Sequence, residues 1–152
     1  MKKIFIGIAA IAYAALQICT GPSIETMDSG LIISWPDTSG NRPGKLKVEV
    51  MDHHIIHIAG TPEPSFTGDS SLVVIRPPGH DIPWEAGSRG NEITLTTDSL
   101  EVRINRQSGA VGFYRITGER LLQEPESGGK RFSPTGKDGL YSIQQAFEPN
   151  KN

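Results

Sequence analysis

Apolar and polar residues alternate strictly between Lys45 and Val50. In a β-strand successive side chains point to opposite faces, so Leu46, Val48 and Val50 would face a core while the residues between them face water. A helix would scatter the same residues around its circumference. The pattern therefore predicts an amphipathic strand over 45–50.

Other short apolar segments predict further strands, separated by glycine and proline. Ser71–Arg76 is a continuous apolar run of the kind buried on both faces, and Ile93–Leu122 has the spacing of a meander. Within the meander we expect Val102 to point inward and Arg103 outward. Ser108-Gly109 and Thr117-Gly118 supply glycines able to adopt positive φ in its turns. The other predicted strands are Leu31–Trp35, Ile55–Ala59 and Leu140–Phe147, and residues 124–139 are expected to be a loop.

The fold class follows from these patterns. The 17 glycines and 11 prolines favour many short strands over long helices. About eight or nine one-faced strands predict an all-β fold, a two-layer antiparallel β-sandwich. The chain of 152 residues fits a single core.

Charge excludes one class of partner. The 15 basic and 17 acidic residues give a formal net charge of -2 and are interleaved along the chain. No basic cluster is present that could follow a phosphate backbone, so we expect no nucleic-acid partner.

The first twenty residues resemble an export signal. Met1–Lys3 is positively charged, and Ile4–Ala12 is an apolar run of about 9 residues, too short to span a bilayer as a helix. Ala12–Ala14 offers the small residues of a signal-peptidase site. A buried first helix is the alternative, but the Thr20–Pro22 break argues against it. We expect a signal peptide over 1–20 and export to the periplasm or cell envelope.

Cys19, the only cysteine, makes an internal disulfide impossible and raises the question of a lipid anchor. Leu16 and Cys19 fit the bacterial lipobox, whereas Ile18 departs from the small residue expected before the cysteine. An outer-membrane lipoprotein anchored at Cys19 is thus an alternative to a soluble exported protein, and this anchor would be its only link to a membrane.

Several segments, in this order and spacing, resemble the N-terminal domain of glycoside hydrolase family 31, the α-glucosidases and α-xylosidases. His57 stands where that family commonly has arginine. The resemblance covers about residues 45–147 and rests on Leu46–Asp52 with Ile55–Ile58, Pro83-Trp84, Leu95–Thr97 with Leu100–Ile104, Ser108-Gly109 through Phe113 to Thr117–Leu122, and Tyr141–Phe147.

The resemblance implies a galactose-mutarotase-like sandwich that packs on a (β/α)8 barrel and shapes its sugar site. The family's two catalytic aspartates, which hydrolyse α-linked glucose or xylose with retention, belong to the barrel. We therefore expect a non-catalytic module truncated before the barrel, with no catalytic residue of its own. The expected divisions are a signal over 1–20, a linker and first strand over 21–44, the sandwich over 45–147 and the start of the connection to the barrel over 148–152.

Two other functions stay open from the residues alone. The chain could be a free-standing carbohydrate-binding sandwich of the envelope, or an exported structural or interaction protein. The first needs an exposed aromatic platform, so the exposure of Trp84 discriminates between them. Trp84 could stack on an α-linked oligosaccharide with Asp81 accepting hydroxyl hydrogen bonds, although packing at the edge of the core is the favoured interpretation for Trp84 and for Trp35.

No cofactor or metal is expected. On one strand His53 and His57 would share a face but lie about 13 Å apart, with His54 on the other side. Ser127–Lys130 lacks the spacing of a phosphate-binding loop. Serine, histidine and aspartate are present, but nothing in the sequence brings them together as a triad.

Overall fold

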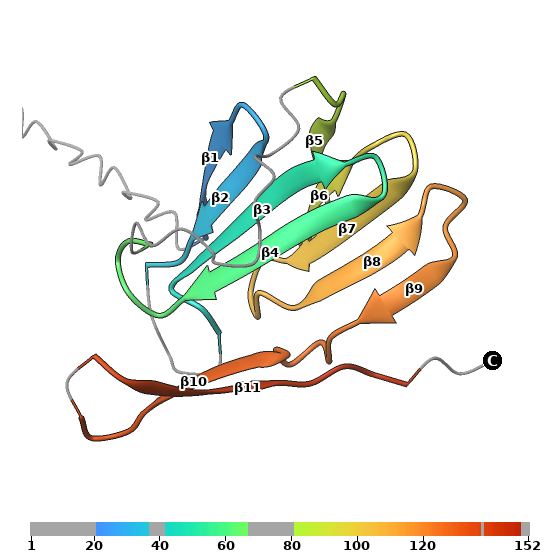
Figure 1. The fold of residues 1–152 in the computed structure, drawn as a ribbon. Helices are drawn as coiled ribbons and strands as arrows, with labels where there is room; N and C mark the ends of the chain where they lie inside the picture. Colours follow the sequence, from blue (N-terminus) through green and yellow to red (C-terminus); the bar gives the residue numbers. More distant parts are fainter. Residues whose placement is uncertain (1–20, 37–41, 67–80, 138, 150–152) are drawn as a thin grey trace, which may run out of the picture.

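A computed structural model describes residues 21–36, 42–66, 81–137 and 139–149 (Figure 1). The predicted signal over 1–20 with Cys19, and the predicted strand over 71–76, lie outside these ranges. The described residues contain no helix, and hence none that could cross a membrane. Their strands are β1 (Ser23–Met27), β2 (Gly30–Ser34), β3 (Lys45–Asp52), β4 (Ile55–Thr61), β5 (Glu85–Arg89), β6 (Glu92–Thr96), β7 (Leu100–Asn105), β8 (Val111–Arg115), β9 (Arg120–Gln123), β10 (Lys130–Pro134) and β11 (Tyr141–Gln145).

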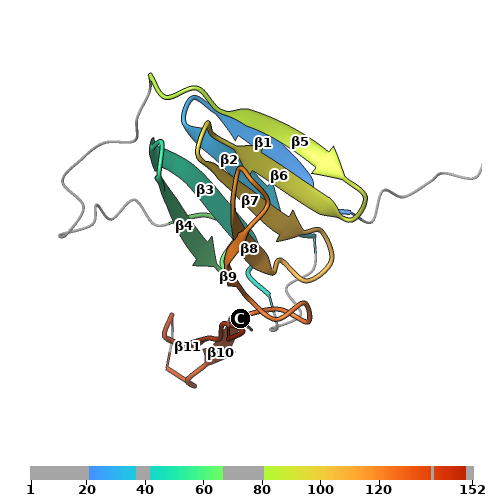
Figure 2. The same cartoon turned by 90° about the vertical axis from the view of Figure 1, so that its right-hand side faces the viewer.

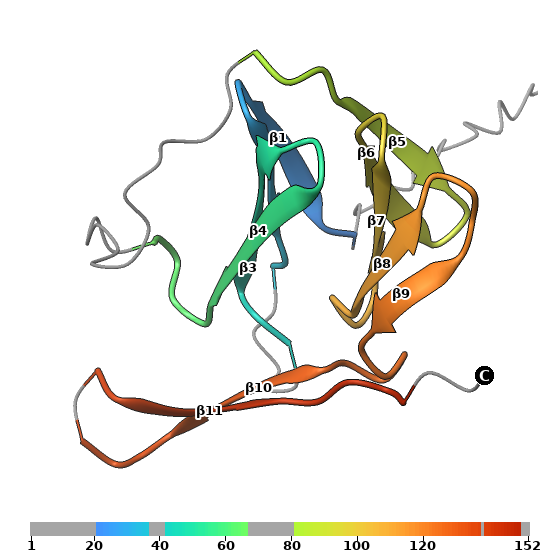
Figure 3. The same ribbon diagram turned by 45° about the vertical axis from the view of Figure 1, so that its right-hand side comes forward.

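Two antiparallel sheets form a sandwich. One has the order β1-β2-β3-β4 and the other β5-β6-β7-β8-β9, so each is a meander of successive hairpins. Figures 2 and 3 show the two sheets face to face, with the β10-β11 ribbon across one end. The predicted all-β sandwich is confirmed.

The core lies between the sheets and follows the alternation in the sequence. Burying a Val, Leu or Ile side chain contributes about 1.5–3 kcal/mol, so these strands hold their register through the core. Arg103, the neighbour of Val102, points outward as expected. The buried cluster comprises Leu31, Ile33, Trp35, Leu46, Val48 and Val50 from the first sheet and the residues leading to it, and Ile93, Leu95, Val102, Ile104 and Val111 from the second.

Residues before Lys45 already belong to the sandwich. β2 coincides with the strand predicted around Leu31–Trp35, and it pairs with both β1 and β3. At Gly30 a Cβ atom would lie 1.9 Å from the carbonyl oxygen of Val48, so only glycine fits against β3. The first sheet therefore begins at Ser23, within the segment expected to be a linker and first strand.

Part of the segment expected to be a loop over 124–139 forms β10, so that expectation is wrong. Phe132 is buried near Gly60 and Pro43, and Lys130 is buried beside Glu124. The Phe132 contact joins residues far apart in sequence, which is why local glycine and proline content did not reveal the strand. In the predicted hairpin turns, Gly109 and Gly118 do adopt positive φ, at 69° and 91°.

Candidate functional site

Trp84 lines a hollow beside the first residue of β5. Its indole packs partly buried against the core, and Nε1 donates a hydrogen bond to the carbonyl oxygen of Asp28 at 3.2 Å. The aromatic residue singled out by sequence thus packs at the edge of the core and also borders a surface hollow. The hollow measures about 350 Å³ and is lined by Pro83, Trp84, Glu85, Thr96, Thr97 and Asp98.

The carboxylates at this hollow are not the one expected from sequence. Asp81 is exposed and is not among the lining residues. Glu85 is brought there because it pairs with Thr96 across β5 and β6, and Asp98 is brought there because it follows β6 in the turn to β7. Glu85 directly follows Trp84 in the chain, whereas the pairing of β5 with β6, which the sequence does not state, brings Asp98 to the same hollow.

Two neighbours hold the Asp98 carboxylate in place. Ser99 Oγ donates to Asp98 Oδ1 at 2.8 Å, and His53 Nδ1 lies 2.8 Å from Asp98 Oδ2. The hydrogen bond from Ser99, followed by that from His53, lowers the pKa of Asp98 below its ordinary value. A serine, an aspartate and a histidine do meet here, but the carboxylate stands between the other two. The imidazole therefore cannot take the proton of the Ser99 hydroxyl, and this is not a nucleophilic triad.

Of the other two histidines that the structure describes, His57 has a structural partner. His57 Nδ1 lies 3.0 Å from Glu49 Oε2, which also accepts from Lys47 Nζ at 3.0 Å, while His54 is exposed. Across residues 21–36, 42–66, 81–137 and 139–149, no three histidine, cysteine, aspartate or glutamate side chains are grouped so as to hold a metal ion.

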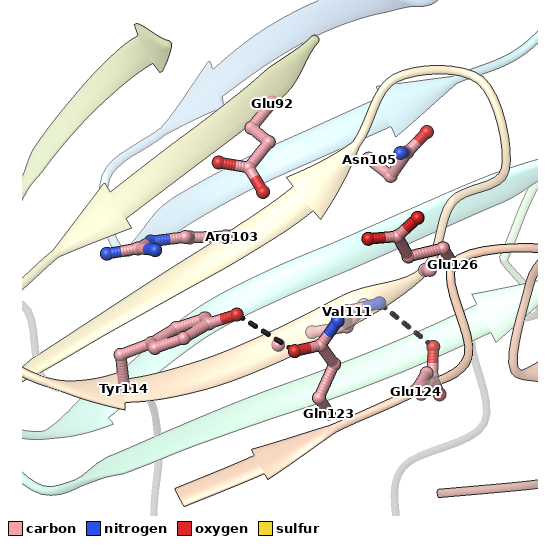
Figure 4. Close-up of a pocket in the computed structure, with 10 residues that line it drawn as sticks. Glu92, Arg103, Asn105, Val111, Tyr114, Gln123, Glu124 and Glu126 are labelled. Atoms are coloured by element: carbon pink, nitrogen blue, oxygen red, sulfur yellow. Dashed lines mark hydrogen bonds between the residues drawn. The ribbon is translucent and has the colours of Figure 1, made fainter. Parts of the chain in front are cut away.

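A second, smaller hollow lies on the outer face of the β5–β9 sheet (Figure 4). Its volume is about 50 Å³, and Glu92 and Glu126 are among the residues that border it. The Tyr114 ring lies against Gly112, where a Cβ atom would come within 2.8 Å of the ring. Tyr114 Oη donates to Gln123 Oε1 at 3.0 Å. This hollow has room for a few water molecules but not for a sugar ring.

Arg103 covers the Tyr114 ring of that second hollow. The guanidinium carbon lies 3.9 Å from the ring centroid, and Arg103 Nε also pairs with Glu101. A cation over an aromatic face stabilises the outer surface of the sheet and occupies the ring face that a ligand would need. This surface is therefore built for packing rather than for stacking a ligand.

Glu124 is the buried polar centre of the molecule. Its Oε2 accepts from the backbone N–H of Val111 at 3.0 Å, while Oε1 accepts from Lys130 Nζ at 2.5 Å and from Gln145 Nε2 at 2.9 Å. Burial lowers the pKa of Lys130, and its hydrogen bond with Glu124 opposes that shift. The cluster fastens the β10-β11 ribbon to β8, and it directs the Lys130 ammonium inward, away from any phosphate at the preceding glycines.

An apolar edge, made of Leu121, Leu122 and Phe147, is exposed beside β9. The backbone N–H of Glu148 donates to the carbonyl oxygen of Gln123 at 2.8 Å, so the segment after β11 runs along β9. The three side chains are 37%, 40% and 45% exposed. Apolar residues gathered at one edge are typical of a surface that meets another protein or domain. We refer to these three residues as the C-terminal apolar edge.

Comparison with known proteins finds this fold in solved structures. No family model matches the chain. An α-xylosidase of glycoside hydrolase family 31 from Xanthomonas citri shares the fold, with a TM-score of 0.67 and 22% identity over 82% of this chain. An uncharacterized protein from Listeria monocytogenes EGD-e matches 72% of the chain with a TM-score of 0.52 and 14% identity.

The chain spans only 13% and 10% of the lengths of those two proteins. At these identities the likeness shows the fold, and it agrees with the resemblance to the family 31 sandwich domain noted in the sequence. The part of the chain that is similar thus has the size of one domain within a much larger protein.

Proposed function

We propose that this chain is a non-catalytic module of an exported α-glycoside hydrolase of family 31. In this proposal the sandwich packs on a catalytic (β/α)8 barrel of the same parent protein and shapes the mouth of a site for α-linked glucose or xylose. The observation that carries the proposal is the shared fold with one domain-sized part of a family 31 α-xylosidase.

The C-terminal apolar edge supports a packing role. Water-exposed leucine and phenylalanine side chains are stabilised when a partner covers them, at roughly 25 cal/mol for each Å² of apolar surface buried. The last described residues run along this same edge through the Glu148–Gln123 hydrogen bond and an ion pair between Arg120 and Glu148. A domain that follows Glu148 in the chain would therefore start beside the surface it has to cover.

The proposal assigns no catalytic residue to this chain. Retaining hydrolysis needs two carboxyl groups about 5 to 5.5 Å apart on either side of the scissile bond. Glu124 is buried under Lys130, and Asp98 is held between Ser99 and His53. The chain purified free of host enzymes should not release p-nitrophenol from α-glucoside or α-xyloside substrates. Turnover that disappears with a single carboxylate substitution would contradict the proposal.

The sharpest test is genetic. The DNA that follows codon 152 should continue in frame into a (β/α)8 barrel with the family's catalytic aspartates. A stop codon there, followed by an unrelated gene, would contradict the proposal.

A biochemical test uses the apolar edge itself. With this edge uncovered, the isolated chain should self-associate. Leu122→Glu should reduce that self-association and weaken binding of the chain to the separately expressed barrel. Ile55→Glu provides the matched control, since Ile55 is 56% exposed in the β3–β4 hairpin and away from this edge. Equal effects of the two substitutions on barrel binding would show that another surface makes the contact.

A free-standing carbohydrate-binding sandwich of the envelope is the second candidate, and the Trp84 hollow favours it. The two functions separate in the barrel-binding measurement, because a free-standing module does not bind a barrel whereas a packing module does. Self-association that is unaffected by Leu122→Glu would also favour this candidate.

We also propose that residues 1–20 direct export, from their charge and apolar pattern. Mass spectrometry of protein purified from the envelope should find a chain beginning after Ala14, or a lipid-modified chain beginning at Cys19. An intact Met1 on folded cytoplasmic protein would contradict this assignment.

A further inference from the structure

We propose that the Trp84 hollow binds one pyranose unit of a neutral oligosaccharide, with the indole as platform and Glu85 and Asp98 as hydroxyl acceptors. The choice of a sugar as ligand class rests on the proposed function. The site itself rests on how the structure places these three side chains.

The platform is fixed before any ligand arrives. One side of the indole packs against the core, and its only donor is used by the carbonyl oxygen of Asp28. The ring therefore loses little side-chain freedom on binding, which removes a cost that usually opposes weak ligands. With its donor spent, Trp84 can contact a ligand only through the apolar ring surface, which suits the C–H face of a pyranose.

The acceptors lie at the same hollow, and one of them is preorganised. Each Asp98 oxygen already has one neighbour, Ser99 Oγ or His53 Nδ1, and a carboxylate has about four acceptor positions. Asp98 therefore keeps capacity for ligand hydroxyls while its orientation is set. Glu85 is exposed and pairs with Thr96 across β5 and β6. It adds a second charged acceptor at the hollow.

Size and charge narrow the ligand class. A volume of about 350 Å³ lies at the small end of ligand sites, which span roughly 300–1,000 Å³, and suits one ring rather than a long chain. Two carboxylates repel phosphates, sulfates and uronic acids. A neutral sugar donates hydroxyl hydrogen bonds to both carboxylates and presents an apolar face to the ring.

The test follows the two indole N–H signals in ¹H–¹⁵N spectra of the folded chain. Trp35 is 6% exposed and its Nε1 donates to the carbonyl oxygen of Arg106, so it serves as an internal reference. Maltotriose, xylotriose and cellotriose are the probes. At least one should shift the Trp84 signal to saturation at millimolar concentration and leave the Trp35 signal in place.

Carboxylate variants locate the contact without disturbing the platform. Asp98→Asn and Glu85→Gln should each weaken binding about tenfold, the effect of losing a hydrogen bond to a charged group. The matched controls are Asp81→Asn, the acid nearby in sequence, and Glu92→Gln, at the smaller hollow of Figure 4. Both should bind as the unmodified chain does. Unchanged Trp35 signals verify folding of each variant.

Three results would overturn the proposal. They are an unmoved Trp84 signal with all three trisaccharides, an equal response to glycerol, which lacks a ring face, and equal weakening by the control and test substitutions. None of these bears on the packing role, which the downstream DNA and the Leu122→Glu variant test separately.

Discussion

Replacing Lys130 by methionine tests whether the Glu124 cluster holds the ribbon to the sandwich. The ammonium lies 2.5 Å from Glu124 Oε1, and the two side chains are 10% and 1% exposed. Methionine keeps most of the volume of the lysine stem but removes the charge. Glu124 then remains as a buried anion whose remaining donors are the Val111 N–H at 3.0 Å and Gln145 Nε2 at 2.9 Å.

The expected loss of unfolding free energy is about 3 kcal/mol. Breaking a buried ion pair typically costs about 3–5 kcal/mol, because one charge is left without its partner. The lower end applies here, since two hydrogen bonds still stabilise the Glu124 carboxylate. The measurement is urea unfolding followed by tryptophan fluorescence, with stability taken from the midpoint and slope.

Two further variants make this result interpretable. The double variant Glu124→Gln/Lys130→Met leaves no buried charge and should recover more than half of the loss. Arg115→Met removes an exposed pair with Glu119, whose side chains are 60% and 63% exposed, and should cost less than about 1 kcal/mol. A Lys130→Met variant as stable as Arg115→Met would refute the buried role of the pair.

Three other predictions follow from burial, close packing and charge. Val102→Asp places a charge at a fully buried position and should cost several kcal/mol by urea unfolding, about 3 or more; a loss below about 1 kcal/mol would contradict the register of β7. Gly30→Ala brings a Cβ against the Val48 carbonyl and should lower stability by about 1–3 kcal/mol in the same assay. Gly21→Ala, with nothing within 4 Å, should change stability little, and equal losses would contradict the close approach. The pKa of Asp98 is lowered on folding, so its contribution to stability is present above the ordinary value of 3.8 and is lost as pH falls through the folded pKa. Asp98→Asn should therefore flatten the acid side of the plot of unfolding free energy against pH. An unchanged plot would show that the Ser99 and His53 contacts do not form in solution.

The central strands could be predicted because apolar and polar residues alternate along them, with the apolar ones buried. In β3, Leu46, Val48 and Val50 are fully buried and the residues between them are not, as alternation predicts. The meander over Ile93–Leu122 also has its expected strands and turns. One buried face is enough to fix both the existence and the register of such strands.

The edge strands β1 and β5 could not be predicted in the same way. All five residues of β5 are exposed, as are four of the five in β1, so neither strand shows alternation. These strands form through backbone hydrogen bonds to β2 and β6. Such bonds do not depend on side-chain type, so the sequence pattern does not reveal them.

The candidate site was only half predictable for a related reason. Trp84 is conspicuous in the sequence, and its partial packing against the core was the favoured interpretation. Asp81 is the acid expected beside Trp84, because the two are close in the chain. Asp98 lies there instead, because β6, which precedes it, pairs with β5, which follows Trp84. The Glu124–Lys130 pair was missed because two charged residues in a glycine-rich segment normally indicate a solvated loop.

The meander order of the two sheets has a consequence for how the chain folds. Every strand in them pairs with its neighbour in sequence, so most of these hairpins close over short turns, and the longest connection, between β2 and β3, is residues 35–44. Closing connections of these lengths has a modest entropic cost. Among the strands that the structure describes, those of the first sheet end at Thr61, and those of the second begin only at Glu85. We therefore expect the β1–β4 sheet to form early, with its apolar face open, and to wait for residues 93–111 to close the core. During synthesis, that interval is when the chain is most prone to aggregation.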